Sequence, residues 1–341
     1  MNYELRIFPT FAPKMEKGKK IIRFLKDWTL PVAIVVGTVC YLTFDLVPAL
    51  DEAGNVLGPV IDVIFPITLF LTLFVTFCKV DFHQMRFHRW QFGILIAQVL
   101  LVALVVGAIL LIDNDTQDSS FNTKLLLEAI LTCIIGPSAV AAPVVVGKLN
   151  GNISTMTTFT LLSSFASSLM IPAVFPILEP TADVAFYDAF LIILEKMLII
   201  LLLPLILGWL VQHFVKSFAR WIESMPNLSI YLWAVSLSIT TGVTVKNIVH
   251  SDASLALLLW IALTSLLLCF VQFFIGQLVG QHLGELVNSR QALFQKNTGL
   301  SIWVAYMYLT PVSSIGAGCY VLWQNIINSL ELWQYRKLKK S

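Results

Sequence analysis

The stretch Gln291-Ala-Leu-Phe-Gln-Lys-Asn-Thr-Gly-Leu300 places a lysine, amides and a glycine in a segment that is otherwise apolar enough to cross a membrane. The apolar run resumes at Leu300, so the sequence predicts a break between two half-helices at Asn297-Thr-Gly299. Backbone that is not helical at membrane depth is tolerated only where protein or a water-filled cavity surrounds it. Because ionisable residues inside spans are rare and mark functional sites, we interpret this stretch as part of a site within the membrane.

Lys296 is the charged residue of this stretch, and its depth decides how it is interpreted. If the segment begins at Leu286, about ten residues at about 1.5 Å each place Lys296 about 15 Å into a hydrocarbon core of about 30 Å. The alternative is a side chain that snorkels, since a lysine stem reaches several ångströms toward water. We favour a position near the midplane of the membrane.

The composition of the whole chain indicates a polytopic membrane protein. Of its 341 residues 57% are hydrophobic and 12% are charged, and the mean hydropathy is +0.83. Soluble domains carry about 25% charged residues. The net charge of +2 is too small to indicate a nucleic-acid partner. The five cysteines lie in or beside apolar stretches without a CxxC pair, so we expect no disulfide, metal site or cofactor. We recognise no cleavable signal peptide in residues 1–28.

Ten apolar segments are each close to the twenty or so residues that a helix needs to cross a membrane. They are residues 30–47, 57–78, 92–112, 125–146, 155–178, 189–211, 230–248, 255–278, 286–309 and 312–333. Lys and Arg gather before the first segment and in alternate connections, whereas Asp and Glu gather in the others. The positive-inside rule then places both termini in the cytoplasm. We expect a multi-pass protein of the plasma (inner) membrane, with residues 1–28 as a cytoplasmic segment.

The fourth and ninth segments each carry a helix break. Pro137 and Pro143 enclose small residues in the fourth segment, and Gly299 follows the amides of the ninth. Ten spans divide into two halves of five, residues 29–178 and 186–335, and five is odd, so the halves have opposite orientations. We therefore expect an inverted repeat whose broken helices cross and present half-helix amino termini to an anion. The alternative for each proline is a simple kink.

These motifs resemble the bile acid:sodium symporter family over nearly the whole chain. The family's fourth span has a proline followed by small residues, similar to Pro137-Ser-Ala-Val-Ala-Ala-Pro143. Its ninth span has Glu-x-Gly-x-Gln-Asn-x-Gly-Leu, similar to Ala292-Leu-Phe-Gln-Lys-Asn-Thr-Gly-Leu300. Its third-span glutamine and last-span Trp-x-Asn look like Gln98 and Trp323-Gln-Asn325. The resemblance implies an all-α fold of ten spans with crossed fourth and ninth helices. In that fold a panel of spans 1, 2, 6 and 7 moves against a core of spans 3–5 and 8–10.

The departures from the family pattern concern sodium. The resemblance implies two sodium ions held by oxygen ligands, most of which are replaced here by groups without a suitable oxygen: Ala292, Ala142, Pro143, Met156 and Lys296. Hard cations need several oxygen ligands, so we expect no bound sodium. We predict that the Lys296 ammonium takes the place of a cation and donates to carbonyls and to Gln98. The alternative is that Lys296 carries a proton and couples transport to protons.

The sequence therefore predicts a secondary transporter of a small organic anion that works by alternating access without sodium, and not an enzyme. The alternatives are a sodium-coupled symporter of bile acids or organic acids, a uniporter like the auxin efflux carriers, and a non-transporting membrane receptor or assembly subunit. The residues expected to bind substrate are Ser138, Ala141, Asn297, Thr298, Gln324 and Asn325. The former cation sites are expected at Gln98, Thr160, Gln295 and Lys296. The expected partners are the substrate and the lipid bilayer, with the oligomeric state left open.

Overall fold

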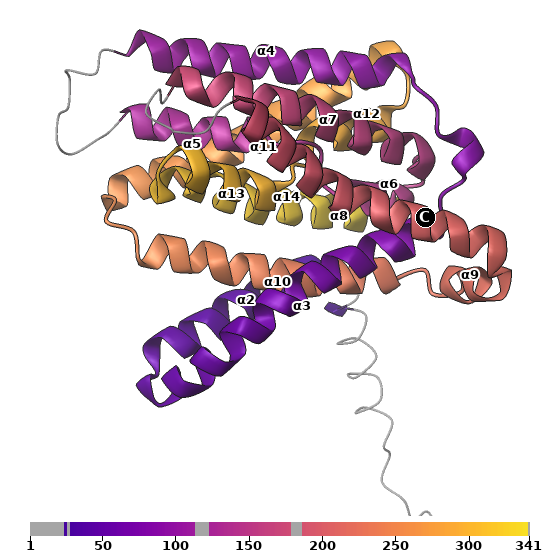
Figure 1. Ribbon diagram of the computed structural model, residues 1–341, viewed down its shortest axis with the longest axis horizontal. Helices are drawn as coiled ribbons and strands as arrows, with labels where there is room; N and C mark the ends of the chain where they lie inside the picture. Colours follow the sequence, from indigo (N-terminus) through magenta and orange to yellow (C-terminus); the bar gives the residue numbers. More distant parts are fainter. Residues whose placement is uncertain (1–23, 26–27, 113–122, 179–185, 340–341) are drawn as a thin grey trace, which may run out of the picture.

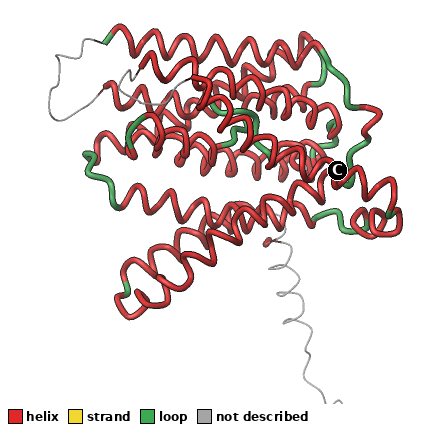
Figure 2. The backbone as a smooth tube through the Cα atoms, in the orientation of Figure 1, coloured by secondary structure: helices red, strands yellow, loops and turns green. Residues whose placement is uncertain are grey.

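Helices make up most of the part of the chain that a computed structural model describes, which is residues 24–25, 28–112, 123–178 and 186–339. They are α2 (Thr29–Leu46), α3 (Asp51–Phe77), α4 (Arg89–Leu111), α5 (Thr123–Ile135), α6 (Ala142–Lys148), α7 (Ile153–Leu178), α8 (Phe186–Phe214), α9 (Lys216–Glu223), α10 (Leu228–Val249), α11 (Leu255–Leu283), α12 (Leu286–Phe294), α13 (Thr298–Tyr308) and α14 (Pro311–Leu338). Two 3-10 turns, Pro48–Leu50 and Phe82–Gln84, join neighbouring helices. The predicted all-helical fold class is confirmed for these residues (Figure 2). Most of the predicted cytoplasmic segment 1–28 lies outside them.

Six helices of the described chain are long and apolar enough to cross a membrane. The number is seven if Leu201–Phe214 and Lys216–Glu223, which meet at a bend of 113°, count as one broken span. The two predicted broken spans cannot pass this test, because their pieces have only 13, 7, 9 and 11 residues. The protein is thus an integral multi-pass membrane protein, and the count of ten spans stays a prediction.

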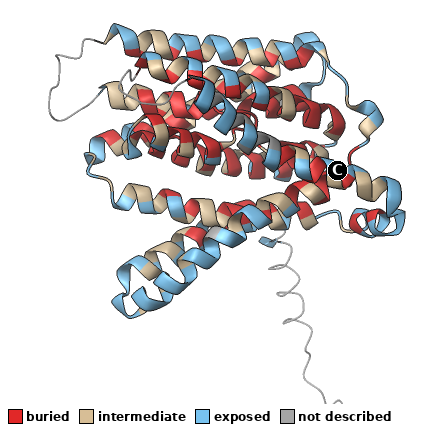
Figure 3. Ribbon diagram, viewed as in Figure 1, coloured by how far each residue is buried: buried red, intermediate tan, exposed pale blue. Residues whose placement is uncertain are grey.

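The helices fall into two groups in Figure 1. α2 and α3 form a hairpin that leans away from the other helices and contacts them mainly through α8 and α10. α5, α11, α12, α13 and α14 pack on one another in the other group, with α4 and α7 beside them. Buried residues concentrate in α5, α7 and α12–α14, whereas α2, α3, α4 and α11 expose apolar side chains such as Val35 and Leu104 (Figure 3). Such an exposed apolar surface is suited to lipid.

Glycines allow the closest helix crossings. A Cβ atom on Gly37 of α2 would lie 2.1 Å from the Ser238 carbonyl oxygen of α10. A Cβ atom on Gly316 of α14 would lie 2.2 Å from the Ala129 carbonyl oxygen of α5. Helices in lipid associate through van der Waals packing, which small residues at the contact make tighter. These two glycines therefore fix how α2 sits on α10 and how α14 sits on α5.

Candidate functional site

Two helix breaks meet inside the molecule. The chain leaves helical conformation at residues 136–141, between α5 and α6, and again at residues 295–297, between α12 and α13. Ala139 N donates to Gln295 O at 2.9 Å, and Asn297 N donates to Pro137 O at 2.8 Å. These bonds make an isolated antiparallel bridge between Ser138 and Lys296. Each break therefore satisfies backbone groups of the other, and we call residues 136–141 and 295–297 together the crossing.

Two of the residues that predicted the breaks, Pro143 and Gly299, lie just after the non-helical residues. Pro143 is the second residue of α6, where a helix has no partner for the missing N–H. Gly299 is the second residue of α13, whose N-cap Asn297 accepts a hydrogen bond from Leu300 N at 3.2 Å. Pro137 alone lies within the non-helical backbone. Pro143 and Gly299 thus begin the second half-helices instead of breaking the first ones.

Lys296 is buried in the crossing, with 1% of its surface exposed. Its backbone N–H donates to Gln324 Oε1 at 3.0 Å, and Gln324 Nε2 donates to Lys296 O at 3.4 Å. Among the residues that the structure describes, Lys296 Nζ has no hydrogen-bond partner. Gln324 of α14 therefore holds the backbone of Lys296, whereas the side-chain amino group of Lys296 is left unpaired. Burying an unpaired charged group costs free energy.

Gln98 and Thr160, the two oxygen-bearing residues that the resemblance places at cation positions, bond to backbone. Gln98 Nε2 donates to Gly136 O at 2.9 Å and to Ile134 O at 3.2 Å, at the carboxyl end of α5. Thr160 Oγ1 donates to Met156 O at 3.0 Å within α7. The predicted hydrogen bond from Lys296 to Gln98 is not formed within the described chain. The Gln98 amide instead satisfies carbonyls that the first break leaves open.

Three of the positions that the resemblance assigns to sodium ligands lie in an apolar cluster. Ala142, Met156 and Ala292 are each at most 1% exposed, and they share this cluster with Trp90 and Phe159. None of these side chains carries an oxygen atom that could replace part of the hydration shell of a cation. These three positions are therefore part of a hydrophobic core.

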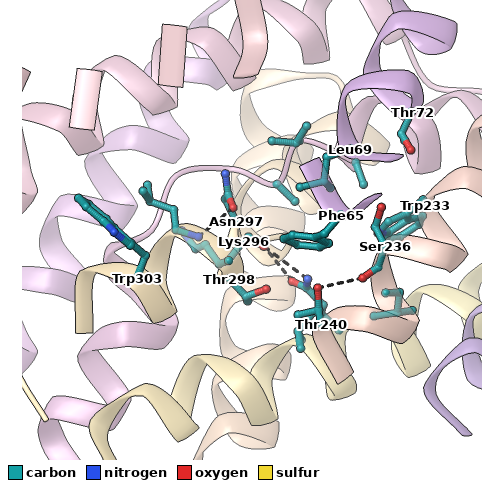
Figure 4. Close-up of a pocket in the computed structure, with 18 residues that line it drawn as sticks. Phe65, Leu69, Thr72, Trp233, Ser236, Thr240, Lys296, Asn297, Thr298 and Trp303 are labelled. Carbon is teal, nitrogen blue, oxygen red and sulfur yellow. Dashed lines mark hydrogen bonds between the residues drawn. The ribbon is translucent and has the colours of Figure 1, made fainter. Parts of the chain in front are cut away.

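A cavity of about 260 Å³ lies between the crossing and the helices α3 and α10 (Figure 4). Four of the predicted substrate-binding residues line it: Ala141, Asn297, Thr298 and Gln324. Lys296 also borders it, whereas Gln295 is a buried C-cap residue outside the lining. Ser138 and Asn325 do not line it, since Ser138 is buried in the crossing and Asn325 Nδ2 donates to Val321 O at 2.7 Å within α14.

The opposite wall of the cavity was not predicted. It is formed by aromatic and hydroxyl side chains of α3 and α10, namely Phe65, Thr72, Trp233, Ser236 and Thr240. Thr68 Oγ1 and Ser236 Oγ lie 2.8 Å apart and join the two helices at this wall. The spacing of Ser236, Thr240 and Thr244 puts hydroxyls on one face of an apolar helix, and this is the signal that could have indicated the wall.

Two lysines hold the turn that precedes α10. Lys79 Nζ, after α3, donates to Met225 O at 3.0 Å. Lys148 Nζ, at the end of α6, donates to Asn227 Oδ1 at 2.6 Å and to Pro226 O. Burial lowers the pKa of Lys148, and the charge of Lys79 lowers this pKa further. Lys148 therefore ties the helix that follows the first break to the helix that forms the far wall of the cavity.

The fold and this cavity define a helical, multi-pass membrane protein with a cavity beside two helix breaks that meet. The sequence model of the sodium bile acid symporter family matches residues 66–251, from within α3 to just beyond α10. This range covers more than half of the chain and includes the first break, whereas the second break lies beyond it. The protein belongs to the sodium bile acid symporter family. A search of curated proteins found no match.

Proposed function

We propose that this protein is a secondary transporter that carries a small organic anion by alternating access and does not use bound sodium. Membership of the sodium bile acid symporter family supports a transporter of that kind. The apolar cluster around Ala142, Met156 and Ala292 is the observation that supports transport without bound sodium. A cation would have to give up its water there without receiving oxygen ligands from these side chains.

The proposal includes ten spans in two inverted halves, residues 29–178 and 186–335. Spacing around the bridge supports it. Asn152 lies fourteen residues after Ser138, and Thr310 lies fourteen residues after Lys296. Each then caps a long helix in the same way, since Asn152 Oδ1 accepts from the N–H three residues on at 3.1 Å and Thr310 Oγ1 does so at 3.2 Å. Equal spacing and equal capping after each break are expected of two repeats.

Alternating access follows from where the cavity lies. In this proposal α2, α3, α8 and α10 form the panel, and α4–α7 with α11–α14 form the core. The cavity has α3 and α10 on one side and the crossing with α14 on the other, so it lies at the panel–core boundary. Rocking of the panel against the core would open this boundary to each side of the membrane in turn.

The lining of the cavity supports a small organic anion. Asn297 and Thr298 lie at the amino terminus of α13, where the helix dipole favours negative charge. Phe65, Trp233 and Trp303 offer aromatic surface to an apolar body. A volume of about 260 Å³ suits a ligand smaller than most drug-sized molecules. In this proposal the Lys296 ammonium lies beside the cavity in place of a bound cation.

The test is a thermal-shift screen of the purified protein against small organic anions, in sodium and in choline, followed by uptake of each hit into proteoliposomes. A ligand that binds the folded protein raises the melting temperature, and the rise grows with the ratio of ligand concentration to Kd. We expect at least one anion to stabilise the protein equally in both salts and to be taken up. Thr240→Trp, which fills the cavity, should remove the shift, whereas Ser168→Ala on α7 should keep it. A screen in which no anion stabilises the protein or enters the vesicles would refute the proposed function.

A further inference from the structure

Two buried polar side chains lie next to each other in the crossing without a partner. The hydrogen bonds of the bridge run between the residues on either side of Ser138 and Lys296, not between these two themselves. In such an antiparallel pair both side chains leave the same face and lie closer than in any other pairing. Each residue is 1% exposed. Within the described chain, neither Ser138 Oγ nor Lys296 Nζ has a hydrogen-bond partner.

The backbone around this pair is held firmly. Ser138 N donates to Ser163 Oγ of α7 at 2.9 Å. Lys296 N and O both bond to Gln324 of α14, and Lys296 O also accepts from Thr298 N at 2.9 Å. The surrounding helices thus fix both residues in place and leave the ends of their side chains unsatisfied. A buried unpaired donor destabilises the protein, and a charged one does so more strongly.

The chemistry of the pair indicates what would satisfy it. An ammonium has only donors, and a hydroxyl can donate, so both groups can bond to one acceptor. An acceptor that also balances the lysine charge is an anion, and hydrogen bonds between charged partners are the strongest. Gln295 Oε1 is unpaired too, but successive side chains of an extended strand leave opposite faces, so it points away from the pair.

The geometry points to an anion site, and we propose that Lys296 and Ser138 bind a small monovalent anion in the crossing. Lys296 borders the cavity, so the anion can arrive from there. Its source is either a free halide or the carboxylate of the transported molecule. The second source rests on the proposed function, whereas a halide binds whether or not the protein transports.

The experiment is a thermal-shift titration of the full chain with potassium bromide and potassium benzoate, in a background of the bulky anion gluconate. We expect a rise in melting temperature that grows with the logarithm of the concentration of at least one probe, as specific binding to the folded protein requires. Lys296→Met should abolish this rise, and Ser138→Ala, which removes one donor, should weaken the apparent affinity about tenfold. Two matched controls should respond like the wild type. They are Lys246→Met, at an exposed lysine of α10, and Ser168→Ala, at a buried serine whose hydroxyl bonds to Phe165 O at 2.7 Å.

The two probes distinguish the sources. A Lys296-dependent response to bromide identifies a free-ion site, and a Lys296-dependent response to benzoate alone identifies a carboxylate site. The inference is overturned if neither probe changes the melting temperature of the wild-type protein. It is also overturned if the response is unchanged in both Lys296→Met and Ser138→Ala. A benzoate response that persists in both variants would show that Lys296 and Ser138 do not form the anion site, but it would remain consistent with the proposed function. If Lys296→Met does not fold, Ser138→Ala decides the question alone, because it removes a single oxygen.

Discussion

The backbone N–H and C=O of Lys296 are both hydrogen-bonded, to Gln324 of α14 and to Thr298 of α13. The side-chain amino group of Lys296 is not needed to hold this backbone in place. Packing a lysine there, 1% exposed, is more costly than packing an apolar residue of the same length. At Ala292 and Met156, which the resemblance assigns to the same ion sites, the protein has buried apolar side chains. A lysine at this one position is therefore best explained by a use of its charge.

We predict that Lys296→Met loses transport while the protein still folds, because the substitution removes the charge and nearly keeps the volume. Lys296→Arg should restore transport poorly, since a planar guanidinium does not replace a compact ammonium. Uptake into proteoliposomes at matched protein amounts measures both variants. If Lys296 instead carries a proton, the methionine variant should lose pH-driven accumulation and still exchange substrate for substrate. Wild-type rates in both assays would show that the lysine charge has no role.

Gly316 is predicted to matter for stability alone. A Cβ atom at this position meets backbone at 2.2 Å, so Gly316→Ala must push α14 away from α5. Overpacking of this kind costs about 1 to 3 kcal/mol and should lower the melting temperature. Gly107→Ala on α4 is the control, because nothing lies within 4 Å of its Cβ position. A melting temperature of Gly316→Ala at or above that of the control would contradict the close α5–α14 contact.

At the scale of elements, the crossing could be predicted and the opposite wall of the cavity could not. Pro137 and the polar run before Gly299 interrupt apolar segments, and such interruptions are visible in a sequence. Thr72 and Thr240 are different, because each donates to the carbonyl four residues earlier in its own helix, at 2.7 Å and 3.0 Å. A hydroxyl that its own helix satisfies fits equally well against lipid, a neighbouring helix or a cavity. Only the packing of α3 and α10 decides among these.

The turn before α10 offers a test of panel movement. Lys148 joins the proposed core to the proposed panel, whereas Lys79 and Met225 both belong to the panel. We predict that Lys148→Met loosens this end of the boundary and increases the reaction of a cysteine introduced at Ala141 with thiol reagents. Lys79→Met, the matched control, should leave that reaction unchanged. Equal reactivity of both variants would mean that Lys148 does not hold the panel against the core.

At the scale of the whole molecule, the charge pattern predicts an orientation that helix packing does not test. In a background with the exposed Cys40 replaced by serine, a cysteine at Asp51 should react with an impermeant maleimide added outside intact cells. Cysteines at Arg86 and Lys216 should react only after the membrane is permeabilised. Reversed labelling would invert the topology, and labelling of Arg86 and Lys216 on opposite sides would overturn the count of ten spans.

We propose that this member of the sodium bile acid symporter family binds no sodium, because apolar residues and a lysine occupy most of the positions that the resemblance assigns to the ions. Binding of radioactive sodium to the purified protein tests this most directly, with and without an anion identified by the thermal-shift screen. We predict no saturable binding under either condition, and none in a Lys296→Gln variant that keeps Ala292. Saturable binding to the wild-type protein, displaced by unlabelled sodium and not by choline, would contradict the account.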